Sequence, residues 1–119
     1  MHELSIALNI VDGALDELKR HGAAKATALH LRLGRLAGVD KDALLFSYGL
    51  ACEETPLASS QLIIEDVDVS VFCPSCESER TVLAFPILQC ANCGASAERV
   101  VHGQELEIVG MEITGMEIM

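Results

Sequence analysis

The sequence predicts a small α+β protein, in which a domain of two helices and three strands is interrupted by a lobe that four cysteines hold. Three features indicate this fold class: a helical apolar pattern near the N-terminus, alternating apolar patterns further along, and two CxxC motifs. The chain has 119 residues, and half of them are hydrophobic. A chain of this size buries one modest core, so we expect one domain with a small appendage.

The N-terminal segment has the apolar spacing of an amphipathic helix. Apolar side chains recur there at steps of four and three, at Leu4, Leu8, Val11, Leu15 and Leu18. This spacing places them on one face of a helix over about 5–21, and we expect that face to be buried. A glycine at position 22 is suited to end the helix, because glycine readily adopts positive φ.

A half-buried strand is predicted over residues 26–36. Apolar and polar side chains alternate there, with leucine at positions 29, 31 and 33 and with His30 and Arg32 between them. Because successive side chains of a strand point to opposite faces, we expect the leucines in the core. The two polar side chains are then expected on a solvated face.

A second helix is predicted over residues 41–53. Asp40 is a suitable N-cap, and Leu44, Tyr48 and Ala51 follow on one face. Cys52 lies beside them on the apolar side. We interpret it as a small buried hydrophobic residue and not as a reactive thiol, so it is left out of the candidate site.

Two β-rich segments complete the chain, over residues 61–72 and 100–113. The apolar phase of the first segment shifts near its middle, which predicts a bulge or a break. The second is predicted to be one last strand. We therefore expect an α+β domain formed by residues 1–69 and 100–119, with the metal-binding lobe at 70–99.

Four cysteines form the strongest motif in the sequence. They occur as two CxxC knuckles, Cys73 with Cys76 and Cys90 with Cys93, and thirteen residues separate the knuckles. Each knuckle can direct two thiolates at one tetrahedral ion. All four positions are cysteine, so no position remains for water or substrate, and a closed structural zinc site is predicted. We expect metal binding to hold this lobe together, because so few residues cannot bury a useful core.

Four cysteines can also form disulfides, bind iron or belong to a zinc ribbon that binds nucleic acid. Disulfides are disfavoured in a cytoplasmic protein, whereas iron would accept the same four-sulfur geometry, and the sequence does not separate zinc from iron. A zinc ribbon that binds nucleic acid needs basic residues. Between positions 70 and 99 only Arg80 and Arg99 are basic, so this use is not supported.

Composition excludes several classes of function. Eight basic and eighteen acidic residues give a net charge of −10, which disfavours nucleic acid and anionic membranes as partners. No apolar run reaches the roughly 18 residues that a bilayer span needs, and no basic signal region precedes the first helix. We expect a cytoplasmic protein. No nucleophile with a base, phosphate loop or open metal site is recognisable, so an enzyme is not predicted.

The N-terminus offers a different kind of metal site. In a chain that begins Met1-His2-Glu3, the α-amine, the deprotonated amide nitrogen of His2 and its ring nitrogen can close fused chelate rings around one ion. Nickel(II) and copper(II) favour the square-planar geometry that results. Taken alone the motif is weak, because many surface termini have a histidine at the second position without binding metal.

A resemblance to a known family strengthens the nickel interpretation. Its residues are Met1–Ser5, Leu33–Leu36, Val39, Leu44, Glu53, Thr55, the motifs CPSC and CANC, Gly103–Leu106 and Met111–Ile113. In this order they resemble the HypA/HybF hydrogenase nickel-incorporation family over nearly the whole chain. The resemblance implies a nickel metallochaperone with structural zinc on the four cysteines and with His2 as the essential nickel ligand.

The resemblance also implies partners and one auxiliary ligand, and a further ligand candidate comes from its position just past the zinc lobe. The expected partners are a HypB-type nickel GTPase and the [NiFe]-hydrogenase large subunit, and some family members also serve urease maturation. Glu3 is carried over as an auxiliary nickel ligand, although an acid that interacts favourably with the helix dipole is an equal interpretation. His102 is a candidate fourth ligand, whereas His21 and His30 are expected to be solvated. Arg35 departs from the family pattern, because the family usually has an acidic residue directly after the glycine that corresponds to Gly34.

A competing hypothesis comes from a different class of protein. In it, the chain is a zinc-ribbon protein-interaction module without nickel function, and its acidic α+β part docks a basic partner. The exposed N-terminus then has no metal to bind. The two hypotheses differ in whether replacing His2 lowers the affinity for nickel.

Overall fold

The computed structural model describes residues 3–115, which form two helices and seven strands. The helices are α1 (Glu3–Arg20) and α2 (Lys41–Cys52). The strands are β1 (Lys25–Gly34), β2 (Gln61–Val67), β3 (Ser70–Cys73), β4 (Ser78–Ala84), β5 (Ile87–Cys90), β6 (Arg99–His102) and β7 (Leu106–Thr114). One sheet has the order β2-β1-β7 and the other β5-β4-β3-β6. Within residues 3–115, neither helix has the length and apolar character needed to cross a membrane.

The chain divides into two compact units. The helical unit contains Met1–Leu31, Gly38–Glu65 and Glu107–Met119, and the cysteine unit contains Arg32–Ala37 and Asp66–Leu106. The predicted fold class, α+β with two helices, a three-strand sheet and a four-cysteine lobe, is confirmed. The predicted division into a nickel-binding domain at 1–69 and 100–119 and a zinc-binding lobe at 70–99 remains a prediction.

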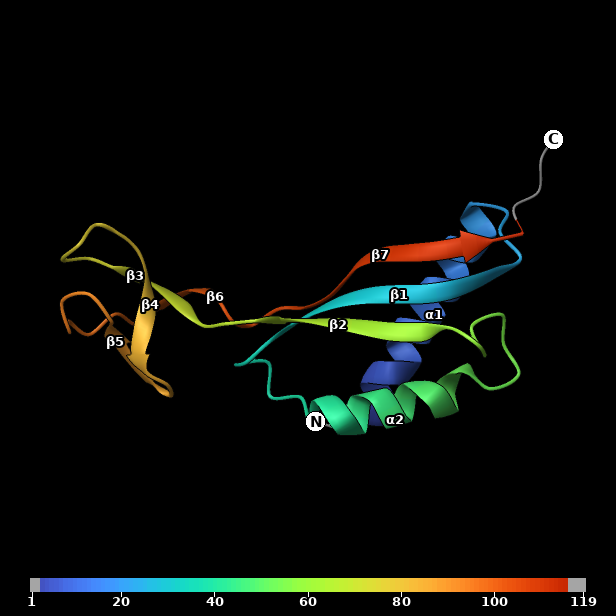
Figure 1. Cartoon of the computed structure of the whole chain (residues 1–119), viewed down its shortest axis with the longest axis horizontal. Coiled ribbons are helices and arrows are strands. Elements are labelled where there is room, and N and C mark those ends of the chain that lie inside the picture. The colour runs from blue at the N-terminus through green and yellow to red at the C-terminus, as the bar shows by residue number, and fades with distance from the viewer. Residues whose placement is uncertain (1–2, 116–119) are drawn as a thin grey trace. The chain divides into compact units, whose positions relative to one another are not determined.

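The core of the helical unit is formed by both helices and by two strands of its sheet. Its buried members are Ile6, Ala7, Val11, Ala14, Leu18, Ala26, Leu29, Leu31, Leu44, Tyr48, Cys52, Leu57 and Leu62. Figure 1 shows β7, β1 and β2 side by side, with α1 crossing behind them. The alternation predicted for β1 is confirmed, because Leu29 and Leu31 are fully buried whereas His30 and Arg32 are only partly so.

The buried face of α1 differs from the predicted one. Val11 and Leu18 are buried as expected, but Leu4 and Leu8 remain 46% and 47% exposed. The helix is rotated so that small residues such as Ala7, which is fully buried, lie at the centre of the interface. An alanine lets a neighbouring element approach the helix closely, and this gain in packing is not visible in the spacing of the leucines alone.

Side-chain caps define both ends of α2. The predicted N-cap is confirmed, since the carboxylate of Asp40 accepts a hydrogen bond from the amide of Ala43 at 3.1 Å. At the other end, the hydroxyl of Thr55 donates to the carbonyl of Cys52 at 2.6 Å. Each bond satisfies a backbone group that has no partner inside the helix.

The cysteine unit has much less apolar material. In its sheet, β3 pairs with both β4 and β6, and β4 pairs with β5, all antiparallel. None of the side chains of β4 is buried. The buried apolar side chains of this unit are Leu33, Val67, Val69, Val71, Cys73, Cys90 and Ala97. So small a core needs a covalent or metal cross-link to be stable.

The single strand predicted over 100–113 is wrong, because the structure has two strands there, β6 and β7, in different sheets. The chain turns at Gly103, which has φ +125°. The carboxylate of Glu105 accepts the amide of Gly103 at 2.7 Å and contacts Nδ1 of His102 at 2.8 Å. Apolar alternation continues on both sides of this turn, so the sequence pattern alone did not reveal it.

The turn at Gly103 lies directly against the end of β1. The amide of Gly34 donates to the carbonyl of Glu105 at 2.8 Å, and the amide of Leu36 donates to the carbonyl of Gly103 at 2.6 Å. A Cβ atom placed on Gly34 would lie 2.1 Å from the carbonyl oxygen of Gly103. Only glycine fits at Gly34, because the atom in the way belongs to the backbone.

The close approach predicts that Gly34→Ala destabilises the protein. The backbone of the turn has to move away from the new methyl group, at an expected cost of roughly 1–3 kcal/mol. Urea unfolding followed by circular dichroism measures the loss. As the control, Gly13→Ala lies inside α1 with no atom within 4 Å of the new Cβ, and it should increase stability by up to about 1 kcal/mol. Equal effects of the two substitutions would contradict the steric explanation.

The turn also predicts a pH dependence. The hydrogen bond with His102 is the main reason that the pKa of Glu105 falls to about 2. Because this pKa is lowered, the carboxylate contributes stability that is complete above the ordinary value near 4.5 and is lost as the pH falls from there toward 2. Carbonyl-carbon NMR should therefore show almost no titration of Glu105 between about pH 6 and 3.5, and His102→Ala should restore a midpoint toward the ordinary value of 4.5. A midpoint near the ordinary value in the unaltered chain would refute this.

Candidate metal centre

The four cysteine sulfurs converge on one point in the cysteine unit. All four Sγ atoms lie within 4.8 Å of one another. Cys73 and Cys93 are 3.5 Å apart, and Cys76 and Cys90 are 3.9 Å apart. A tetrahedron with metal–sulfur bonds of about 2.3 Å has sulfur–sulfur edges of roughly 3.8 Å. The predicted cluster is confirmed, and its donors fit one tetrahedral ion with no open coordination position.

The two knuckles use the same local backbone turn. The residue that follows each knuckle has positive φ, +54° at Glu77 and +77° at Gly94. Within the knuckles, the amide of Cys76 donates to the sulfur of Cys73, and the amide of Cys93 donates to that of Cys90, both at 3.4 Å. Such bonds stabilise a thiolate, so the backbone favours the ionised form that binds metal.

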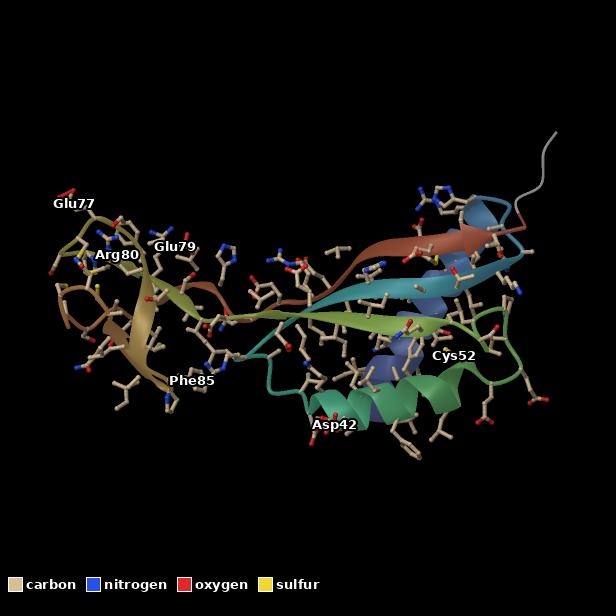
Figure 2. The ribbon with its side chains drawn as sticks, viewed as in Figure 1. Asp42, Cys52, Glu77, Glu79, Arg80 and Phe85 are labelled. Atoms are coloured by element: carbon tan, nitrogen blue, oxygen red, sulfur yellow. The ribbon has the colours of Figure 1, made fainter. Side chains whose placement is uncertain are left out.

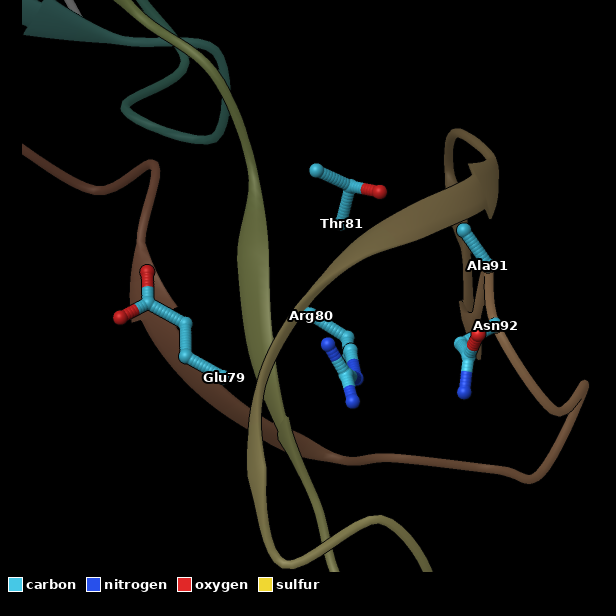
Figure 3. A pocket seen from close by; sticks show the side chains of 5 residues that line it. All are labelled: Glu79, Arg80, Thr81, Ala91 and Asn92. Atoms are coloured by element: carbon cyan, nitrogen blue, oxygen red, sulfur yellow. The ribbon is translucent and has the colours of Figure 1, made fainter.

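Two side chains add to the stabilisation of the Cys76 thiolate. The amide of Asn92 donates to the sulfur of Cys76 at 3.4 Å. This bond, followed by one from the guanidinium of Arg80, lowers the pKa of Cys76 to about 6. Figure 3 shows Arg80 and Asn92 at a surface pocket of about 400 Å³, which Glu79, Thr81 and Ala91 also line. Sequence reasoning missed both residues, although an asparagine inside a CxxC knuckle is a usable signal.

The effect on Cys93 has the opposite direction. The amide of Ala95 lowers the pKa of this thiol, but hydrogen bonds with Cys73, Cys90 and Cys76, together with burial, outweigh it and raise the pKa to about 11. Four thiolates this close together cannot all ionise unaided. A divalent cation at their centre removes that obstacle, because it attracts every sulfur.

Of the four candidate nickel ligands, the structure describes two, Glu3 and His102. Met1 and His2 are outside the described residues. Glu3 is the first residue of α1, and its carboxylate accepts a hydrogen bond from the amide of Asp40 at 3.2 Å. The first amides of a helix have no partner within the helix. The carboxylate of Glu3 is therefore engaged at the start of α2, while α1 itself offers no acceptor to its backbone nitrogen.

The histidines within the described residues do not gather at one site. His102 belongs to the cysteine unit, where Nδ1 contacts Glu105. His21 lies 3.3 Å from Glu17 at the end of α1, and His30 lies 2.8 Å from Glu112 on the sheet. Each of these three rings has a carboxylate neighbour on its own unit, which gives at least one ring nitrogen a partner without a metal.

Two residues that the sequence singled out have local roles. Arg35, which departs from the family pattern, contacts the carboxylate of Asp68 at 3.2 Å and lies over the ring of Phe85 at 4.4 Å. Cys52 is only 2% exposed, and burial raises the pKa of its thiol. The interpretation of Cys52 as a buried small side chain is confirmed.

Comparison with known proteins agrees with these observations. A family model described as "Hydrogenase/urease nickel incorporation, metallochaperone, hypA" matches residues 1–113. The "Hydrogenase maturation factor HypA" of Chloroflexus aurantiacus is 50% identical over 112 residues, which cover 94% of this chain and 98% of the relative. The protein of the same name from Chlorobaculum parvum is 30% identical over 113 residues, which cover 95% and 99%.

A solved structure shows the same fold. The solution structure of the Ni metallochaperone HypA from Helicobacter pylori superposes with a TM-score of 0.70 and covers 97% of this chain and 99% of that one. At 21% identity this similarity shows the fold alone. The matches along the sequence show the family, which is one of metallochaperones and not of enzymes. The chain belongs to the HypA family, the nickel metallochaperones of hydrogenase maturation, as its sequence predicted.

Proposed function

We propose that this chain binds one nickel(II) ion at its N-terminus and delivers it for hydrogenase maturation. In this proposal the α-amine of Met1, the amide nitrogen of His2 after loss of its proton to solvent, and the ring nitrogen of His2 hold the ion. The observation that supports it is the Met-His-Glu sequence at the start of a chain whose family incorporates nickel. Nitrogen ligands in a plane suit nickel(II), and protonation of His2 provides a route to release.

The position of Glu3 suggests how a fourth donor is supplied. Because its carboxylate is occupied by the amide of Asp40, its backbone nitrogen is the better auxiliary ligand. That nitrogen begins α1 and has no acceptor within the helix. His102 remains the alternative donor, and using it would require the ring to leave Glu105.

We also propose that the four cysteines bind a single structural zinc ion. Sulfur positions that fit a tetrahedron support this assignment, as do the closed donor set and the small apolar core around it. Four thiolates in this arrangement suit zinc. The ion would contribute folding free energy, which in comparable zinc peptides is on the order of 10–16 kcal/mol.

We also propose partners and a location for the chain. A HypB-type nickel GTPase and the [NiFe]-hydrogenase large subunit are the proposed partners in the cytoplasm, and urease maturation proteins are proposed as further recipients. Support comes from the family description, which names both hydrogenase and urease nickel incorporation. The net charge of −10 favours partners with basic surfaces over nucleic acid or anionic membranes.

The nickel proposal predicts that His2→Ala abolishes tight nickel binding. Losing the imidazole opens a chelate ring, and we expect affinity to fall at least about 100-fold in calorimetric titration of the untagged, zinc-loaded chain. An extra residue before Met1 should have a similar effect, because it displaces the α-amine. His21→Ala is the matched control, since this exposed histidine neighbours Glu17 at the far end of α1.

The same variants test delivery. Nickel should pass from the loaded chain to a purified HypB-type GTPase, and less of it should pass from His2→Ala. Unchanged affinity in both N-terminal variants would move nickel elsewhere or exclude it. Tight nickel binding without any transfer of nickel to the GTPase would support the nickel site and refute the proposed partner.

The zinc proposal predicts that Cys73→Ser lowers zinc content from one ion per chain to below one in the presence of a mild chelator. The remaining three sulfurs cannot close the tetrahedron, so amide NMR signals of the cysteine unit should collapse while those of α1 and α2 persist. Cys52→Ala removes a cysteine outside the cluster and should leave zinc content at one. Full zinc content in Cys73→Ser would contradict the assignment.

A further inference from the structure

Helix α2 exposes apolar side chains on the face opposite its core. Leu44, Ser47, Tyr48 and Cys52 are its buried residues. On the other side, Leu45, Phe46 and Leu50 are 39%, 71% and 47% exposed, and the exposed Gly49 lies among them. We call these four residues, Leu45, Phe46, Gly49 and Leu50, the α2 patch. Positions i, i+1, i+4 and i+5 adjoin on a helix, so the patch is continuous.

Its composition sets the patch apart from scattered surface leucines. The chain has only three phenylalanines, one tyrosine and no tryptophan. Phe46 is one of these few aromatic side chains, yet 71% of it faces solvent. Isolated exposed apolar residues are common, whereas a contiguous group that includes an aromatic ring marks an interaction surface. Aromatic rings are also prominent among the residues that dominate binding energies.

Gly49 adds an observation that the fold does not explain. It lies inside α2, where glycine is less favourable than alanine. A Cβ at Gly49 would meet no atom within 4 Å, so no neighbour within the described residues requires its absence. A gap between Phe46 and Leu50 instead lets an approaching side chain reach the helix backbone.

Acidic residues border the patch at both ends of the helix. Asp42 lies in the first turn, and Glu53 and Glu54 follow the last turn, which contains no basic residue. Figure 2 shows Asp42 on the outward side of α2. Acids at a helix C-terminus interact unfavourably with the helix dipole. Cations from a partner would relieve Glu53 and Glu54 while apolar side chains cover the patch.

We infer that the α2 patch docks a partner protein that presents an amphipathic helix, apolar on one face and edged by lysine or arginine. Its apolar side chains would cover Phe46 and Leu50, and its basic edge would meet the acids. A second copy of this chain does not fit, because a two-fold contact would bring the same acids together. Docking at the α2 patch involves no metal, so a test of this inference is independent of the test of the nickel site.

The test uses a synthetic helical peptide of leucine on one face and lysine on the other, with nitrogen-15-labelled full-length protein loaded with zinc. Amide shifts should change along α2, and Phe46→Ser should lower the affinity about tenfold or more. Phe46 is mostly exposed, so this substitution should leave the unfolding temperature nearly unchanged. Leu83→Ser, a leucine of the cysteine unit that is 60% exposed, is the matched control and should bind normally.

Gly49→Ala separates docking from stability. Alanine is the better helix former, so the unfolding temperature should rise, while the new methyl group should weaken peptide binding several-fold. A purely structural role for Gly49 cannot give these opposite signs. Asp42→Asn with Glu53→Gln should weaken binding further and reduce its dependence on salt.

Three outcomes would overturn the inference. The first is no binding of the lysine peptide, or equal binding of a peptide with glutamate in place of lysine. The second is binding that Phe46→Ser does not change, which would indicate nonspecific attraction to an acidic protein. The third is a dimer in sedimentation equilibrium that Phe46→Ser dissociates, since this would assign the patch to a second copy of the chain.

Discussion

Repulsion among four thiolates within 4.8 Å of one another is the constraint on which the cysteine unit depends. Apart from two cysteines, the buried apolar residues of this unit are three valines, one alanine and one leucine, and β4 buries none of its side chains. Backbone amides of the knuckles, with Asn92 and Arg80, lower the cost of ionising the sulfurs but do not abolish it. A central cation therefore has two functions at once, since it neutralises the thiolates and it cross-links a sheet that lacks a sufficient core.

The helical unit, in contrast, is stabilised by the packing of apolar side chains. Its two helices and sheet share one apolar cluster with fully buried Leu29, Leu31 and Leu44. Its polar contacts include the local N-cap of α2 and a long-range hydrogen bond from the amide of Asp40 to the carboxylate of Glu3. The chain therefore combines a unit stabilised by hydrophobic burial with a unit stabilised by metal ligation, and these two terms respond to different conditions.

How much the sequence foretold depends on the kind of signal. The spacing of the cysteines predicted the metal cluster, because two CxxC motifs close together are rarely found without a metal site. The alternation of apolar and polar residues around Leu29 and Leu31 predicted β1. The face of α1 was misjudged because spacing does not weigh alanine packing against leucine bulk. The turn at Gly103 was missed because it interrupts an apolar pattern that continues on both sides. Asn92 and Arg80 act through tertiary geometry, which no local pattern records.

The burial of Cys52 has a consequence for the chemistry of the whole chain. A thiol that is 2% exposed and whose pKa is raised by burial stays protonated and out of reach of ions and electrophiles. The other four cysteines share one cluster. The accessible thiols of the folded protein are thus confined to a single centre, and the fifth thiol does not compete with that centre for a thiophilic metal. The reactivity of the folded chain toward thiol reagents therefore reports how fully metal occupies this one centre.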